Sequence, residues 1–96
     1  MPLRFEWDRT KARVNEAKHG ISFEEARTAF GDPCSLTIHD SRSPIEDRYV
    51  LVGMTEQGRL VVVVHVERGD NLRLISARRP TRHERATYEE SRREEI

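Results

Sequence analysis

The first twenty residues have the pattern of a short extended segment followed by one helix, with signals for where the helix begins and ends. Residues 3–7 alternate apolar and polar side chains as a short strand does. Asp8 then precedes a stretch whose first turn has no apolar residues, which is typical of an N-cap. The pattern predicts a helix that begins at Arg9 and stops at Gly20, because glycine can take the left-handed conformation that closes a helix.

A second helix is predicted directly after the first. Ser22 and Glu25 have the spacing of a capping box, in which each side chain binds the backbone of the other residue. The helix should cover residues 23–30 and end at the glycine, aspartate and proline of 31–33. The apolar spacing gives its expected buried face: Phe23, Ala26 and Phe30.

After residue 34 the apolar period changes from helical to extended. Residues 35–39 form a weak strand and 48–55 a stronger one, with a polar loop over 40–47 between them. A turn at 56–58 leads to a strand over 59–67. The run 60–64 in it is apolar on both faces, which indicates a central strand covered on each side.

The last third of the chain predicts one more strand and a C-terminal helix. A tight turn at 69–71 returns the chain as a strand over 72–79, which Pro80 ends because it has no backbone N–H to donate. Thr81 and Glu84 form a second capping box, so a helix should run over 82–94. The order of a short N-terminal strand, two helices, an antiparallel four-stranded meander and a helix predicts an α+β domain.

The register of the last hairpin decides which side chains share a face. With a three-residue turn, Glu67 faces Arg73 and His65 faces Ile75, so that His65, Arg73 and Arg79 lie on one face. The opposite face would then carry Val62, Val64, Val66, Leu72 and Leu74. A two-residue turn moves the pairing by one residue and separates His65 from Arg73.

Composition sets the scale and the setting. A chain of 96 residues has room for a single domain with one core. The one cysteine, Cys34, excludes an internal disulfide, and neither a membrane span nor a signal peptide is evident, so we expect a cytoplasmic protein. Its four scattered histidines show no metal-ligand spacing, so we expect neither a metal site nor a cofactor.

The charges cancel over the whole chain but not locally. Formal net charge is zero, and all but two of the 17 basic residues are arginine, whose flat fork suits phosphates or ion-pair networks. A GC-rich genome would give the same bias. Between residues 73 and 85 one acid stands against five arginines, which form a local basic patch: Arg73, Arg78, Arg79, Arg82 and Arg85.

Several sequence blocks together resemble a known family. They are Phe5-Glu6-Trp7-Asp8 with Lys11, then Asn15, Lys18-His19-Gly20, Ser22-Phe23-Glu24-Glu25-Ala26, and Leu74-Ile75-Ser76-Ala77-Arg78-Arg79 with Glu84 and Tyr88. Spread over nearly the whole chain, this combination is similar to the BrnT family. The resemblance implies a RelE-like ribonuclease, the toxin half of a type II toxin–antitoxin pair. It also implies a BrnA-type antitoxin partner with a ribbon-helix-helix DNA-binding end, in a heterotetramer or larger assembly that meets DNA only through the antitoxin.

Metal-free RNA cleavage needs a proton acceptor for the 2′-hydroxyl, cations for the phosphate and a proton donor for the leaving oxygen. The expected phosphate ligands are Arg73, Arg78 and Arg79. Candidates for proton transfer are His65, Lys18, His19 and Tyr88, and candidates for RNA contact are Arg82, Arg85, Trp7 and Lys11. Each has a structural alternative: acids could pair the arginines, the core could hold His65, Tyr88 and Trp7, and a helix dipole alone favours cations at 18–19.

Two other functions are open at this stage. The same fold could be a non-catalytic module that binds RNA or a protein, or it could be a purely structural subunit. Alanine substitution of the arginines separates the three, because an enzyme loses cleavage, a binder loses affinity and a structural subunit loses only stability.

Overall fold

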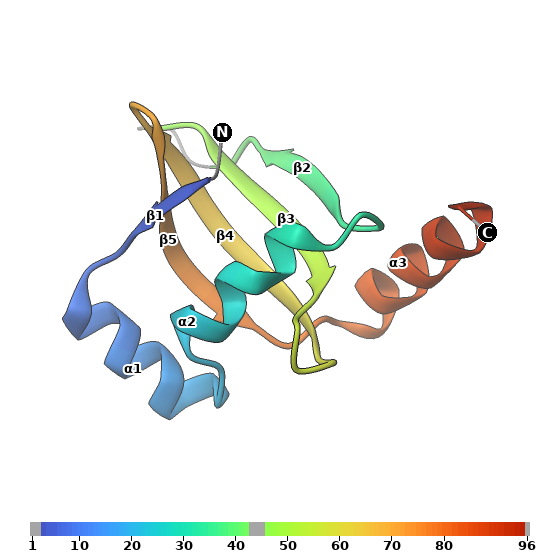
Figure 1. The fold of residues 1–96 in the computed structure, drawn as a ribbon, viewed down its shortest axis with the longest axis horizontal. Coiled ribbons are helices and arrows are strands. Elements are labelled where there is room, and N and C mark those ends of the chain that lie inside the picture. Colours follow the sequence, from blue (N-terminus) through green and yellow to red (C-terminus); the bar gives the residue numbers. More distant parts are fainter. Residues whose placement is uncertain (1–2, 43–45, 96) are drawn as a thin grey trace.

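The computed structural model describes residues 3–42 and 46–95, so that 43–45 of the predicted polar loop lie outside it. In chain order the elements are β1 (Arg4–Glu6), α1 (Arg9–His19), α2 (Phe23–Ala26), the 3₁₀ helix η1 (Arg27–Gly31), β2 (Leu36–Asp40), β3 (Arg48–Met54), β4 (Leu60–Arg68), β5 (Asn71–Arg78) and α3 (Arg82–Glu95). This arrangement of helices on one antiparallel meander confirms the predicted α+β class (Figure 1).

All five strands form one sheet in the order β1-β5-β4-β3-β2. Strands β2 to β5 pair antiparallel in sequence order, whereas β1 pairs in parallel with β5, from Arg4 opposite Asn71 to Glu6 opposite Arg73. The first strand of the chain is therefore held by the last one. Because β1 is only three residues long, it covers the first part of β5 and leaves the rest of that edge to other partners.

The predicted helix caps are present, except that the Glu25 carboxylate of the first capping box accepts hydrogen bonds from Arg59 and Thr55 in place of the Ser22 backbone N–H. The Asp8 carboxylate accepts a hydrogen bond from the Lys11 backbone N–H at 3.0 Å, and the Ser22 hydroxyl accepts one from Glu25 N–H at 3.1 Å. Gly20 has a φ of 71°, and its N–H donates to the Glu16 carbonyl at 2.8 Å, which closes α1. These caps fix where α1 ends and where the next helix begins.

The second helix differs from the prediction. It is α-helical only as far as Ala26 and continues as the 3₁₀ helix η1 to Gly31. The tighter winding accompanies a close approach to β3, where a Cβ added to Gly53 would lie 3.0 Å from the Ala29 carbonyl oxygen. Phe23 and Ala26 are buried as expected, while Phe30 is half-buried against the edge of Phe5.

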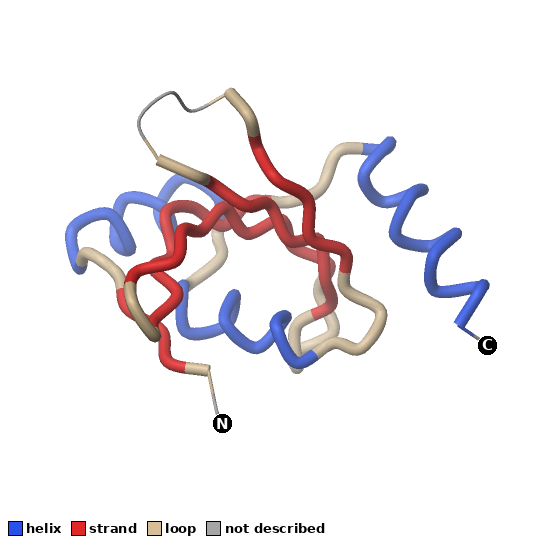
Figure 2. Tube along the Cα trace, turned by 90° about the horizontal axis from the view of Figure 1, so that it is seen from above, coloured by secondary structure: helices blue, strands red, loops and turns tan. Residues whose placement is uncertain are grey.

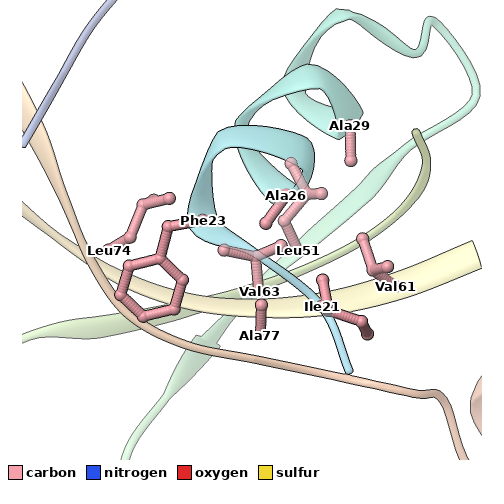
Figure 3. Packing of buried hydrophobic residues seen from close by; sticks show 9 residues of the cluster. All are labelled: Ile21, Phe23, Ala26, Ala29, Leu51, Val61, Val63, Leu74 and Ala77. Atoms are coloured by element: carbon pink, nitrogen blue, oxygen red, sulfur yellow. The ribbon is translucent and has the colours of Figure 1, made fainter. Parts of the chain in front are cut away.

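Two layers of apolar side chains pack on the two faces of the sheet. The larger cluster lies under α2 and η1 (Figure 3) and comprises Ile21, Phe23, Ala26, Ala29, Leu51, Val61, Val63, Leu74 and Ala77. The smaller one lies on the opposite face and comprises Val50, Val52, Leu60, Val62 and Tyr88. Successive residues of β3 and β4 alternate between the clusters, so both strands are covered on both faces, as the apolar run 60–64 predicted for β4.

The last helix buries one side chain against the sheet. Figure 2 shows α3 standing off the sheet, and Tyr88 is its only fully buried residue within the range that the structure describes. The Tyr88 hydroxyl donates to an Asp32 carboxylate oxygen at 2.6 Å. Burial and this hydrogen bond raise the pKa of Tyr88 to about 12.

The hairpin register predicted from a three-residue turn is wrong near the turn. Only Gly69 and Asp70 separate the Arg68–Asn71 pair, and Gly69 takes a φ of 59°, which glycine adopts without strain. His65 therefore pairs with Leu74, and Val66 pairs with Arg73. Since cross-strand partners share a face, His65 and Arg73 lie on opposite faces of the sheet.

The same hairpin changes register within its length. A β-bulge interrupts the pairing of β4 with β5 between Val64 and His65, and its extra residue is on β5. Leu74 pairs with His65 and Ser76 pairs with Val64, and Ile75 between them has no partner on β4. The predicted face of Val62, Val64, Val66, Leu72 and Leu74 is thereby split. Leu72 pairs with Glu67 and Leu74 with His65, on the face opposite Val66.

Candidate functional site

The end of α1 and the end of β5 meet at a cationic depression. Lys18, His19 and Gly20 line it from the helix, and Arg78 and Arg79 line it from the strand end. Its volume is about 470 Å³. Four of the predicted site residues therefore converge on one place, although some 60 positions separate the two pairs in sequence.

Two further depressions adjoin this one and share residues with it. One, of about 310 Å³, runs between α1 and β5 and shares Lys18 and His19. The other, of about 330 Å³, shares Arg79 and is lined also by Arg59 and Arg85. We call the combined surface the basic groove; its basic residues are Lys11, Lys18, His19, Arg59, Arg78, Arg79 and Arg85.

Asn15 fastens the two sides of the groove together. This side chain is buried, and its amide nitrogen donates to the Ala77 carbonyl at 2.9 Å and to the Ile21 carbonyl at 3.1 Å. Its amide oxygen accepts from the Ala77 N–H at 3.1 Å. The Asn15 amide thus pairs with Ala77 as a neighbouring strand would, on a stretch of β5 that the short β1 does not reach.

Arg59 holds the turn after α1 from the other direction. Its guanidinium donates to the Gly20 carbonyl at 3.0 Å and to the Glu25 carboxylate, where one bond measures 2.9 Å. The Thr55 hydroxyl donates to the same carboxylate at 2.9 Å. The bonds from Arg59 and Thr55 lower the pKa of Glu25 and keep it ionised at neutral pH.

The two adjacent arginines of the groove are in different states. Arg78 is bound by both oxygens of Glu84, at 2.8 and 2.9 Å, and this arginine lowers the pKa of Glu84 to about 2. Glu84 also accepts from the Thr81 N–H at 2.8 Å, which completes the predicted capping box of α3. Arg79 is exposed and forms no ion pair within residues 3–42 and 46–95, so its charge is open to an anion.

His65 and Tyr88, two of the residues considered for proton transfer, are placed elsewhere. His65 is 5% exposed and packs against Phe30 and Tyr49, with ring centroids 4.8 and 6.0 Å apart. Burial lowers the pKa of His65, so it is neutral at physiological pH. Tyr88 is 2% exposed, and its hydroxyl donates a hydrogen bond to Asp32. Neither side chain lines the groove.

Three other candidates also lie outside the groove. Arg73 donates to Glu6 on β1 at 2.8 Å, on the far part of β5. Trp7 packs edge-on against Phe23, with ring centroids 5.9 Å apart, next to the larger core cluster. Arg82 is exposed at the start of α3 and lines none of the three depressions.

Two contributors were not identified from the sequence. Arg59 was read only as the first residue of a strand, and Asn15 carried no role beyond its place in a family-like block. A helical projection of residues 9–19 would have shown Asn15 as a polar residue on the inner side of α1, and that position is the signal for its role. For Arg59 no local pattern points to Gly20 or Glu25, because the contacts span 39 and 34 residues.

Within residues 3–42 and 46–95, no group of three or more histidine, cysteine, aspartate or glutamate residues is arranged to hold a metal ion. No helix in these ranges is long and apolar enough to cross a membrane.

Comparison with known proteins identifies the class and then the family. A family model described as "Ribonuclease toxin, BrnT, of type II toxin-antitoxin system" matches residues 7–84, which places the chain among the toxins of type II toxin–antitoxin systems. Within that class, it belongs to the BrnT family. As such a toxin it has an antitoxin partner.

A solved structure agrees with the fold. The crystal structure of the Brucella abortus ribonuclease toxin BrnT superposes with a TM-score of 0.66 at 20% sequence identity, covering 84% of this chain and all of that one. At this identity the match concerns the fold alone. No curated protein matches the sequence.

Proposed function

We propose that this protein is an endoribonuclease that cuts RNA in the basic groove without a metal ion and thereby inhibits translation. The observation that carries the proposal is the meeting of Lys18 and His19 with Arg78 and Arg79 around one depression. Cations that face a cleft from two elements can bind the phosphate of a bound strand and stabilise the charge that grows on it. The family description as a ribonuclease toxin supports the same reaction.

The groove offers a group for each step of 2′-hydroxyl attack. His19 accepts the 2′-hydroxyl proton, since a histidine can take up and release protons near neutral pH. The 2′-oxygen bonds to phosphorus, and the bond from phosphorus to the 5′-oxygen breaks, which leaves a 2′,3′-cyclic phosphate and a 5′-hydroxyl. Arg79 and Lys18 bind the non-bridging oxygens, and a proton from Lys18 or from water goes to the leaving oxygen. DNA has no 2′-hydroxyl and should not be cut.

Arg78 has a supporting role in this proposal. Its two bonds to Glu84 hold its guanidinium at the groove wall and connect the start of α3 to the end of β5. Because the Glu84 carboxylate compensates its charge, Arg78 shapes the groove wall and leaves Arg79 and Lys18 to attract the phosphate. His65, Arg73, Trp7, Arg82 and Tyr88 are left out of the reaction, because the fold places them outside the groove.

We further propose that the fold is RelE-like and that the partner is an antitoxin of the BrnA type. In this proposal the antitoxin carries a ribbon-helix-helix domain, contacts DNA for the complex and assembles with the toxin as a heterotetramer or larger, in the cytoplasm. The exposed cations of the groove favour a partner segment with acidic residues. A pull-down of the tagged toxin with the product of the adjacent gene tests this pairing.

The test of the activity compares two groove variants with a matched surface variant. Arg79→Ala and His19→Ala should abolish growth arrest on induction, and the purified variants should lose at least about tenfold in RNA cleavage, as expected when one charge-stabilising or proton-transfer group is removed. Arg93→Ala removes an exposed arginine from the last turn of α3 and should leave both unchanged.

Other outcomes would favour another function. If the wild type binds RNA and cuts none, and Arg79→Ala lowers the affinity with a smaller salt dependence, the protein is a binding module of the same fold. If the groove variants alter stability but no RNA property, its role is structural. Chelation by EDTA tests the metal-free step, since activity lost on chelation and restored by a divalent cation would contradict it.

A further inference from the structure

One part of the basic groove is lined by apolar as well as charged side chains. It is the depression between α1 and β5, formed by Thr10, Lys11, Val14, Asn15, Lys18, His19, Ile75 and Ser76. Val14 is the apolar residue that α1 contributes to this depression, and it is 61% exposed on a helix that is otherwise rich in charged residues. Exposing a valine gains nothing for folding, so the position is available for contact with a ligand.

The bulge in β5 supplies the opposite apolar wall. Leu74 pairs with His65 and Ser76 pairs with Val64, so Ile75 is the extra residue between two paired ones. A bulge redirects a side chain that regular alternation would place elsewhere. Here Ile75 lines the same depression as Val14, and it comes from the strand that faces α1.

The chemistry of this depression matches one component of a nucleic acid. A base has an apolar face, for which Val14 and Ile75 provide contact area, and polar edges, for which Thr10 and Ser76 provide polar lining. The volume of about 310 Å³ leaves room for a single base. Lys18 and His19 also line the adjoining depression beside Arg78 and Arg79, so a base here and a phosphate there can belong to the same strand.

We infer that the depression between α1 and β5 is a base-binding subsite, which receives one unpaired nucleobase of the RNA whose phosphate lies at Arg79. This inference rests on the proposed ribonuclease function. It makes Val14 and Ile75 determinants of how tightly the strand binds and of where it is cut, while the cations bind the backbone of any sequence. A duplex keeps its bases stacked and paired, so single-stranded RNA is the substrate.

Binding of short RNAs with blocked 2′-hydroxyls tests the subsite separately from cleavage. The probes are 2′-O-methyl tetra-adenylate and tetra-uridylate, with an abasic tetranucleotide of the same charge. Val14→Ser should weaken binding of the two base-bearing probes by about three- to tenfold, the loss expected for one aliphatic contact, and should not change binding of the abasic probe. Ile75→Thr keeps the branched shape, so it should fold while giving the same selective loss.

Ile38→Ser is the matched control, because Ile38 is 65% exposed on β2, away from the groove, and should affect no probe. Equal losses for base-bearing and abasic probes, or no loss for either, would overturn the subsite, as would a wild type that does not distinguish the probes. Loss of antitoxin binding with unchanged probe binding would assign the depression to a side chain of the partner and would overturn it too.

Cleavage of unmodified RNA, measured in parallel, separates the subsite from the function on which it rests. A wild type that cuts RNA at the same positions and rate as Val14→Ser contradicts the subsite alone. A wild type that cuts no RNA contradicts the ribonuclease proposal, whatever the probes show.

Discussion

Replacement of Asn15 by alanine is the substitution whose effect can best be worked out from the structure. The change removes one buried amide and leaves the Ala77 N–H, the Ala77 carbonyl and the Ile21 carbonyl without the partner that each has now. These groups lie where α1, the turn after it and β5 meet, so solvent cannot replace the amide without opening that junction. The substitution should therefore lower the stability of the protein and also disturb the junction of α1 with β5 that forms the groove.

The expected magnitude follows from the three hydrogen bonds. A buried hydrogen bond contributes about 1 kcal/mol net, and a buried donor left unpaired costs about 1–3 kcal/mol. The free energy of unfolding should therefore fall by about 3 kcal/mol, a large share of the 5–15 kcal/mol typical of a domain. For a chain of this length the corresponding fall in Tm is about 10–20 °C.

Urea unfolding followed by circular dichroism at pH 7 measures this loss, with Glu16→Ala as the control, because Glu16 is an exposed neighbour on α1. Asn15→Asp adds a second comparison. It keeps an acceptor for the Ala77 N–H but sets a carboxylate oxygen against two carbonyls, so it should be at least as unstable as Asn15→Ala at pH 7 and should recover in part when protonated at lower pH. An Asn15→Ala protein within about 0.5 kcal/mol of the wild type, the range of ordinary surface substitutions, would refute the reasoning.

Three further substitutions test other contacts. Glu84→Gln should lower the free energy of unfolding by about 2 kcal/mol at pH 7 and leave it nearly unchanged near pH 2. The pKa of Glu84 is about 2 in the folded protein against an ordinary value of 4.5, so the stabilisation is present above pH 4.5 and is lost as the pH falls toward 2. Urea unfolding at several pH values measures this difference, and a difference that does not change with pH would contradict the reasoning. Tyr88→Phe removes the hydrogen bond to Asp32 and should lower stability by about 1–2 kcal/mol without changing RNA cleavage per folded molecule, whereas a selective loss of cleavage would return Tyr88 to the site. Gly53→Ala should lower the free energy of unfolding by about 1–3 kcal/mol, and with it the thermal midpoint, because the new methyl group lies 3.0 Å from the Ala29 carbonyl oxygen. An unchanged midpoint would show that η1 moves to make room for the methyl group.

The parts of the fold that follow from local chemistry were predictable. Caps such as Asp8 and Ser22 and the left-handed Gly20 act within a few residues, and the structure has them where the sequence placed them. The apolar run at the start of β4 likewise indicated a strand buried on both faces, which Val61 and Val62 confirm with 0% exposure each.

The parts that depend on contacts between distant elements were not predictable. One residue in the turn decided the register near Gly69, and the bulge at Ile75 then changed it, so the expected neighbourhood of His65 was wrong. Lys18 and Arg79 were each named as candidates, but nothing in their spacing indicated that they share a depression. That depends on α1 lying along β5, which Asn15 secures through partners six and 62 residues away.

The junction of α1 with β5 has a consequence for folding during synthesis. Lys18 and His19 are made well before their counterparts Arg78 and Arg79, and before the Ala77 backbone that Asn15 requires. A nascent chain that has not yet reached residue 77 therefore has neither the Asn15–Ala77 pairing nor the groove. A partner that binds the groove recognises only chains in which β5 has already been made.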